Sequence, residues 1–98
     1  MKYENVLFDF VSADEDASSG RGSVITDDKR MTLDLVTDDG VSYVISGKAV
    51  RTYFSGRSID GSVTVEWGDI GGNFVGIWVE DGFEYFIRFR LPSKNARR

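Results

Sequence analysis

Residues 72–92, GNFVGIWVEDGFEYFIRFRLP, consist of two apolar runs on either side of an Asp81-Gly82 pair. Asp-Gly is one of the strongest short-range signals for a β-hairpin, because both residues tolerate a positive φ in the turn. A two-residue turn at this point pairs Trp78 with Tyr85 and Phe74 with Phe89, and so places these rings on one face. The segment therefore predicts two antiparallel strands whose aromatic face belongs to a core.

The two faces of this hairpin differ in composition. The face assigned to the core carries Phe74, Trp78, Phe83, Tyr85, Ile87, Phe89 and Leu91. The opposite face is also apolar, and is bordered by arginine; its residues are Val75, Ile77, Val79, Phe86, Arg88 and Arg90. A core on one side does not explain this second group, so we interpret it as a candidate protein interface.

The same turn signal recurs upstream. Asp39-Gly40, Asp60-Gly61 and Asp81-Gly82 follow one another at intervals of 21 residues, which indicates a repeated up-and-down unit of two strands. The register that keeps apolar residues on one face assigns a three-residue loop to 38–40 and two-residue turns to 60–61 and 71–72. These turns pair Leu35 with Tyr43, Phe54 with Trp67, Gly56 with Val65, and Trp67 with Gly76.

A further turn is predicted at Gly47-Lys48, because glycine suits the first central position of a type II′ turn. This turn pairs Ile45 with Val50 and Tyr43 with Thr52. Upstream, a strand over 3–12 places Val6, Phe8 and Phe10 inward, and residues 13–22, ADEDASSGRG, are expected to form a polar loop. A hairpin of 23–26 and 30–37 follows, with an inner face of Met31, Leu33 and Leu35.

The sequence therefore predicts an all-β fold of about eight antiparallel strands in up-and-down meander order. A small closed or partly open barrel is favoured, because closure removes exposed strand edges, and a two-sheet β-sandwich is the alternative. Residues 1–92 form a single domain in this interpretation, and 93–98 a basic, disordered tail. Gly76-Ile77-Trp78 matches the Gly-X-Trp that begins lipocalin-type barrels, but lies late in the chain. The predicted meander is thus similar to calycin barrels in architecture, without indicating membership of a family.

The composition argues against catalysis and against a bound cofactor or metal. The chain has no cysteine and no histidine, so thiolate nucleophiles, imidazole bases and the usual zinc ligands are absent. The inward-leaning acids Asp69 and Glu80 lie at strand ends, where carboxylates usually meet water. No acidic segment matches a calcium loop; a weak calcium site is left open for Asp27, Asp28, Asp38 and Asp39.

The net charge, and the lack of a membrane span or a signal peptide, limit the partners and the cellular location that we expect. A formal net charge of -4 argues against nucleic acid, which requires a concentrated basic face. No apolar run reaches the roughly 20 residues of a membrane span. The first ten residues, MKYENVLFDF, do not resemble a signal peptide. Together with the lack of cysteine, this leads us to expect a cytoplasmic protein.

Two binding hypotheses remain. The first is a non-catalytic module that binds a protein, or a second copy of itself as a homodimer, through the outer face of the 73–91 hairpin. The alternative is a calycin-like binder of a small apolar or aromatic ligand, in a pocket lined by Tyr43, Thr52, Phe54, Gly56, Trp67, Gly76, Trp78 and Tyr85. An anionic partner is a third possibility, which would use Arg51, Arg57, Arg88 and Arg90.

Overall fold

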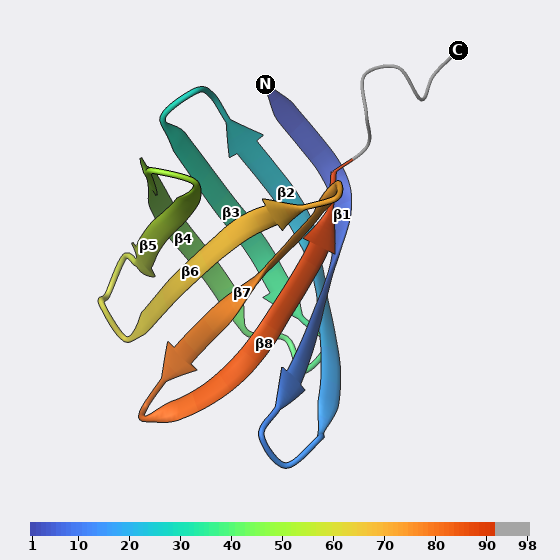
Figure 1. The fold of residues 1–98 in the computed structure, drawn as a ribbon. Coiled ribbons are helices and arrows are strands. Elements are labelled where there is room, and N and C mark those ends of the chain that lie inside the picture. Colours follow the sequence, from blue (N-terminus) through green and yellow to red (C-terminus); the bar gives the residue numbers. More distant parts are fainter. Residues whose placement is uncertain (92–98) are drawn as a thin grey trace.

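The structure of the chain is a computed structural model that describes residues 1–91. The expected basic tail, 93–98, lies outside the described residues. Eight strands follow one another along the chain, and Figure 1 shows them. They are β1 (Lys2–Ser12), β2 (Ala17–Thr26), β3 (Arg30–Thr37), β4 (Ser42–Val50), β5 (Tyr53–Ser58), β6 (Val63–Ile70), β7 (Asn73–Glu80) and β8 (Phe83–Arg90).

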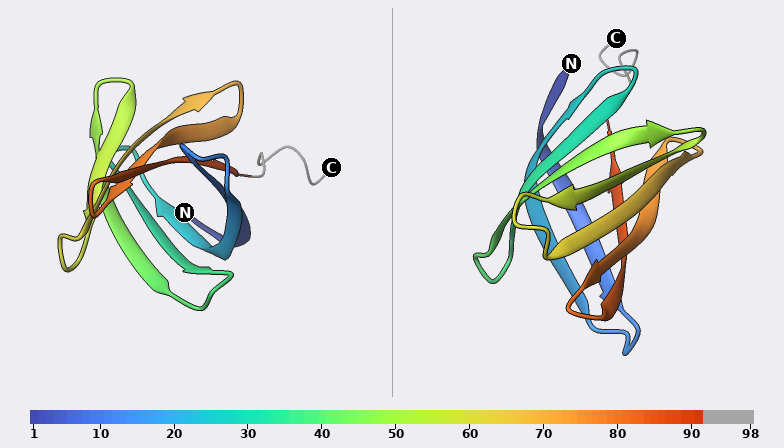
Figure 2. Two further views of the ribbon diagram at one scale, coloured as in Figure 1. Left: turned by 90° about the horizontal axis from the view of Figure 1, so that it is seen from below. Right: turned by 90° about the vertical axis from the view of Figure 1, so that its left-hand side faces the viewer.

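The strands form one closed antiparallel barrel in sequential order, which confirms the predicted meander. Closure occurs where β1 pairs with β8, with Phe10 opposite Ile87 and Val11 opposite Phe86. The ring of strands is evident when the molecule is turned, as in Figure 2. A two-sheet sandwich is therefore excluded.

Side chains that point inward from the strands fill the interior of the barrel. Inward positions are buried and outward positions are exposed along most strands, as in β6, where Val63, Val65 and Trp67 are at most 1% exposed. The buried apolar side chains come from β1, β2, β3, β4, β6, β7 and β8, and they form a single cluster inside the barrel. Burial of apolar surface on this scale is the main stabilising term of such a fold.

Most of the predicted registers are confirmed. Leu35 lies opposite Tyr43, and Gly40 takes a φ of 89° in the three-residue loop, as expected for a left-handed glycine. The pairs Phe54–Trp67, Trp67–Gly76 and Trp78–Tyr85 also form as predicted. Phe83 is an exception, because it lies at the end of the barrel and is 67% exposed rather than part of the core.

The turn predicted at Gly47-Lys48 is wrong. Strand β4 continues to Val50, and the chain turns at Arg51 and Thr52, where Arg51 has a φ of 57°. Gly47 is instead an inward position of β4, and the ring of Trp67 occupies the space where its side chain would be. The glycine signal at this position therefore reports a close approach inside the barrel and not a turn.

The polar loop predicted over 13–22 is wrong in its second half, because β2 begins at Ala17. Gly20 and Gly22 lie inward there, opposite Phe8 and Val6 of β1. A Cβ at Gly22 would lie 1.9 Å from the carbonyl oxygen of Asp34 on β3. The glycines thus permit the strong coiling that closes a small barrel, and they also make the segment resemble a loop.

The meander places successive connections at alternate ends of the barrel. One end, here called the acidic end, carries the connections 13–16, 38–41, 59–62 and 81–82. Two of them, 13–16 and 81–82, lie at the lower end in Figure 1. The opposite end carries 27–29, 51–52 and 71–72. Asp27 and Asp28 therefore lie at the other end from Asp38 and Asp39, and these four acids do not form one calcium site.

Candidate functional site

A hollow of about 150 Å³ lies at the acidic end of the barrel. It is bordered by strand ends that the barrel brings together from β1, β2, β3, β4, β7 and β8, and by the 38–41 connection. Its lining residues are Phe10, Ser18, Thr37, Asp38, Asp39, Tyr43, Trp78, Glu80 and Tyr85. The site thus combines four aromatic rings with three carboxylates.

The aromatic part of the hollow is organised around Trp78. Phe10 lies 5.2 Å from it between ring centroids, at 82°, and Tyr43 lies 5.0 Å from it, at 87°. Both contacts are edge-to-face, an arrangement that the ring quadrupoles favour. Tyr85 is the cross-strand partner of Trp78. Because Trp78 is only 3% exposed, the arrangement of these rings is held by the core beneath them.

Glu80 is the polar centre of the site. Its carboxylate accepts a hydrogen bond from Trp78 Nε1 at 3.1 Å, and one from the Tyr43 hydroxyl at 3.0 Å. The hydrogen bond from Tyr43 joins β4 to β7 across the end of the barrel. Burial and the hydrogen bond to Glu80 raise the pKa of Tyr43 to about 12, so its hydroxyl stays protonated and donates over the physiological pH range.

The structure brings together only part of the pocket predicted from sequence. Tyr43, Trp78 and Tyr85 line the hollow. Phe54 and Trp67 instead stack on each other, with ring centroids 5.8 Å apart, and Trp67 is 1% exposed. The remaining three predicted residues lie elsewhere: Thr52 is exposed in the β4–β5 turn, while Gly56 and Gly76 each border a groove on the outside of the barrel.

Sequence reasoning missed several residues of the hollow. Phe10 was predicted to lie inward, but nothing linked it to Trp78, because that contact depends on closure between β1 and β8. Glu80 was interpreted as a solvated strand-end acid. Its position two residues after Trp78, on the same face of β7, was the available signal, since their side chains lie together. Asp38 and Asp39 reach the hollow because of the conformation of the 38–41 connection, which the sequence pattern does not reveal.

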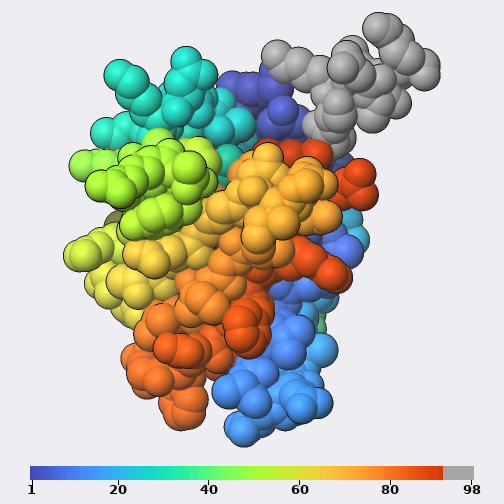
Figure 3. Space-filling model, viewed as in Figure 1, coloured from blue at the N-terminus to red at the C-terminus, as the bar shows by residue number. Residues whose placement is uncertain are grey.

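The candidate interface lies on the outside of β7 and β8, and β1 extends it. A groove of about 480 Å³ is lined by Asp9, Val11, Val75, Gly76, Ile77, Phe86, Ile87 and Arg88. Phe86 is 62% exposed, opposite Val11 on β1. Figure 3 shows these strands, orange to red and blue, adjoining on the face toward the viewer. Strand β1 therefore continues this surface instead of covering it.

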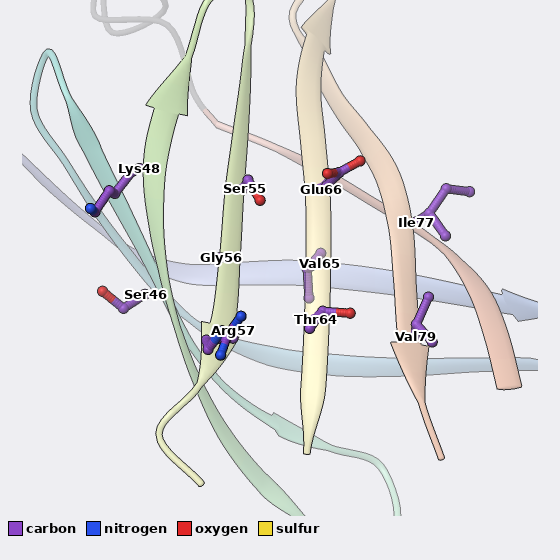
Figure 4. A pocket seen from close by; sticks show the side chains of 10 residues that line it. All are labelled: Ser46, Lys48, Ser55, Gly56, Arg57, Thr64, Val65, Glu66, Ile77 and Val79. Atoms are coloured by element: carbon purple, nitrogen blue, oxygen red, sulfur yellow. The ribbon is translucent and has the colours of Figure 1, made fainter. Parts of the chain in front are cut away.

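Val79 belongs to a second outer groove, of about 570 Å³, across β4 to β7, which Figure 4 shows from close by. Ile77 lines both grooves, and Arg90 is exposed on β8 but borders neither of those two. The second groove is more polar, with Ser46, Lys48, Ser55, Arg57, Thr64 and Glu66 among its lining residues. The four arginines considered for an anionic partner do not gather, since Arg57 lies here and Arg88 in the first groove.

Exposed apolar side chains are not confined to the last hairpin. Leu7, Ile25 and Val36 are each nearly half exposed on the outside of β1, β2 and β3. An apolar outer face is therefore not peculiar to the last hairpin. What distinguishes the β7–β8 face is the groove and the large exposed ring of Phe86.

Comparisons with known proteins add evidence on the fold. The chain matches no protein-family model and no curated protein. Among solved structures it is similar to a de novo designed, fluorescence-activating β-barrel, with a TM-score of 0.57 and 22% sequence identity, over 91% of this chain and 92% of the designed one. Residues 1–91 contain no helix long and apolar enough to cross a membrane. Within residues 1–91, no three acidic side chains, those of the hollow included, lie close enough together to hold a metal ion.

Proposed function

We propose that the protein is a non-catalytic binding module that takes a small molecule into the hollow at the acidic end of its barrel. The observation that carries this proposal is the grouping of Phe10, Tyr43, Trp78 and Tyr85, from four strands, around one hollow. Apolar walls with a few fixed polar groups are the usual composition of a ligand site. The hydrogen bonds that hold Glu80 supply such a fixed group.

The size of the hollow restricts the ligand. At about 150 Å³ it is smaller than the roughly 300 Å³ or more of a drug-sized pocket. An engineered cavity of about 150 Å³ in another protein holds benzene. We therefore infer a ligand, or the part of one that enters, of about one ring or a few branched carbon atoms. The likeness to a designed barrel described as fluorescence-activating is compatible with this use of the fold.

Nuclear magnetic resonance tests the proposal without mutation, because the chain has two tryptophans in different places. The probes are benzyl alcohol, 3,3-dimethylbutan-1-ol and choline, each titrated separately. We expect at least one to move the Trp78 indole N–H signal to saturation, while the Trp67 signal, from the centre of the core, stays in place. If none of the three produces a saturable shift of Trp78, the proposal is wrong.

A matched pair of variants assigns the binding to the hollow. Ser18→Leu places a larger apolar side chain in its lining, and should abolish the shift of Trp78. Ser46→Leu makes the same chemical change in the outer groove of Figure 4, and should leave binding unchanged. Equal losses in both variants would contradict binding in the hollow.

A second candidate function is self-association through the outer face of β7, β8 and β1. The observation in its favour is the apolar groove beside Phe86, which is 62% exposed and bordered by Arg88 and Asp9. Aromatic residues and arginine are enriched at protein contacts. We expect a concentration-dependent dimer in sedimentation equilibrium that Phe86→Glu dissociates and Phe83→Glu, at another exposed phenylalanine, does not. A wild-type monomer at high micromolar concentration would rule this candidate out.

A further inference from the structure

We infer that the hollow at the acidic end selects a small organic cation, such as an ammonium ion with methyl substituents. This inference rests on the proposed function, and names the class of ligand that the same site takes. It follows from three features of the described residues: the rings around the hollow, the carboxylates that border it, and the charge of the connections at that end of the barrel.

The rings provide a surface that attracts a cation. Phe10 and Tyr43 each lie nearly perpendicular to Trp78, so the walls of the hollow run in two planes. A rounded group in the hollow can therefore lie against the face of one of these rings. Ring faces carry negative charge from the π-electrons and bind quaternary ammonium groups.

The polar groups of the hollow also favour a positively charged ligand. Its lining includes the carboxylates of Asp38, Asp39 and Glu80, and no lysine or arginine. Two donors of the lining, Tyr43 Oη and Trp78 Nε1, are already engaged by Glu80 and are not free to bind an anion. A carboxylate has about four acceptor positions, so Glu80 retains capacity for a further interaction.

The connections around the hollow add further negative charge. The four connections at the acidic end contain seven acids, which are Asp14, Glu15, Asp16, Asp38, Asp39, Asp60 and Asp81, and no basic residue. The connections at the opposite end contain two acids, Asp27 and Asp28, and two bases, Lys29 and Arg51. A cleft lined by one sign of charge raises the local concentration of the opposite ion. A cation is therefore attracted toward this end of the barrel.

The test compares choline with 3,3-dimethylbutan-1-ol, which has the same shape but carries carbon in place of the charged nitrogen. Both are titrated at equal ionic strength, with the Trp78 indole N–H signal as the readout. We expect choline to bind at least about tenfold more tightly, since a desolvated cation–π contact alone is worth roughly that factor. We also expect added sodium chloride to weaken the binding of choline and not that of the alcohol.

Two variants of equal charge locate the effect. Glu80→Gln keeps a hydrogen-bond acceptor for Tyr43 and Trp78 but removes the charge, so it should lower choline affinity several-fold more than it lowers that of the alcohol. Glu66→Gln removes a charge from the outer groove of Figure 4, and should change neither. If the alcohol binds as tightly as choline, the preference for a cation is wrong while the proposed site stands. If neither compound moves Trp78, while benzyl alcohol does, the inference also fails; if all three fail, the site itself is refuted.

Discussion

The ring of Trp67 lies against the backbone of Gly47, so that a Cβ atom at residue 47 would lie 2.4 Å from the ring. Trp67 extends from β6 across the interior to β4, and its Nε1 lies 3.0 Å from the sulfur of Met31 on β3. A single side chain thus links β6 to β3 and β4, neither of which pairs with β6 in the barrel. This contact joins two sides of the barrel through its core.

Substitution of Gly47 by alanine should therefore destabilise the barrel. The added methyl group meets a buried ring that has little freedom to move, and overpacking of this kind costs about 1–3 kcal/mol. Gly68→Ala is the matched control, because a Cβ there meets nothing closer than 3.6 Å. Urea unfolding should show a loss for Gly47→Ala and little change, or a slight gain, for Gly68→Ala. Equal stabilities of the two variants would contradict the close contact.

Gly22→Ala should cost more than Gly20→Ala on the same strand. At Gly22 a Cβ would lie 1.9 Å from the backbone oxygen of Asp34 on β3, whereas at Gly20 it would lie 3.0 Å from the end of the Leu35 side chain and 3.1 Å from the Val36 oxygen. A side chain can adjust, but a paired backbone cannot without losing hydrogen bonds. Unfolding free energies and amide exchange in β2 and β3 measure the difference, and the reverse order would refute this explanation.

The contribution of Asp60 to stability should disappear in acid. The Asp60 carboxylate accepts hydrogen bonds from the Ser62 N–H and from the hydroxyls of Ser58 and Ser62, which lower its pKa from 3.8 to about 2. Because the folded protein favours the charged form, this stabilisation is present above about pH 4 and is lost as the pH falls toward 2. Asp60→Asn should therefore reduce the unfolding free energy at pH 7, and by less near pH 2. A carboxyl resonance of Asp60 that titrates near pH 4 would contradict the prediction.

Tyr43 should ionise later than an ordinary tyrosine. Burial and the Glu80 carboxylate raise its pKa to about 12, so the folded protein favours the neutral phenol. The corresponding stabilisation is complete below pH 10 and is lost as the pH rises from 10 to 12. The difference in ultraviolet phenolate absorbance between the wild type and Tyr43→Phe isolates this titration. Glu80→Gln should bring the transition to a lower pH without restoring an ordinary value, because burial is the larger cause.

The ion pair between Arg88 and Asp9 should contribute little to stability. The two side chains are 65% and 43% exposed, and their charged atoms are 3.2 Å apart. Exposed pairs of this kind are worth about 0–1 kcal/mol. A double-mutant cycle with Arg88→Gln and Asp9→Asn should give a coupling energy in that range that decreases with salt. A larger coupling energy that does not change with salt would contradict this prediction.

Much of the fold could be predicted from local patterns. The Asp-Gly and Gly-Gly turns, together with the period-two alternation of strands such as β6 and β8, determine the register, since a slip of one residue would expose the core face. The turn signal failed at Gly47 and at Gly20 and Gly22. At these positions glycine is needed because an atom of another strand lies close to it. The local sequence does not show which strand will lie there.

The sequence by itself determined the all-β class, the order of the strands and most of the side chains that face inward, because turn chemistry and alternation act over a few residues. The tertiary structure alone decided closure between β1 and β8, the contact of Trp67 with Gly47, and the meeting of Phe10, Tyr43 and Trp78 around Glu80. These contacts join residues far apart in the chain, and their distances depend on how sharply the whole sheet coils. The candidate site is therefore a property of the closed barrel, whose strand ends bring its residues together.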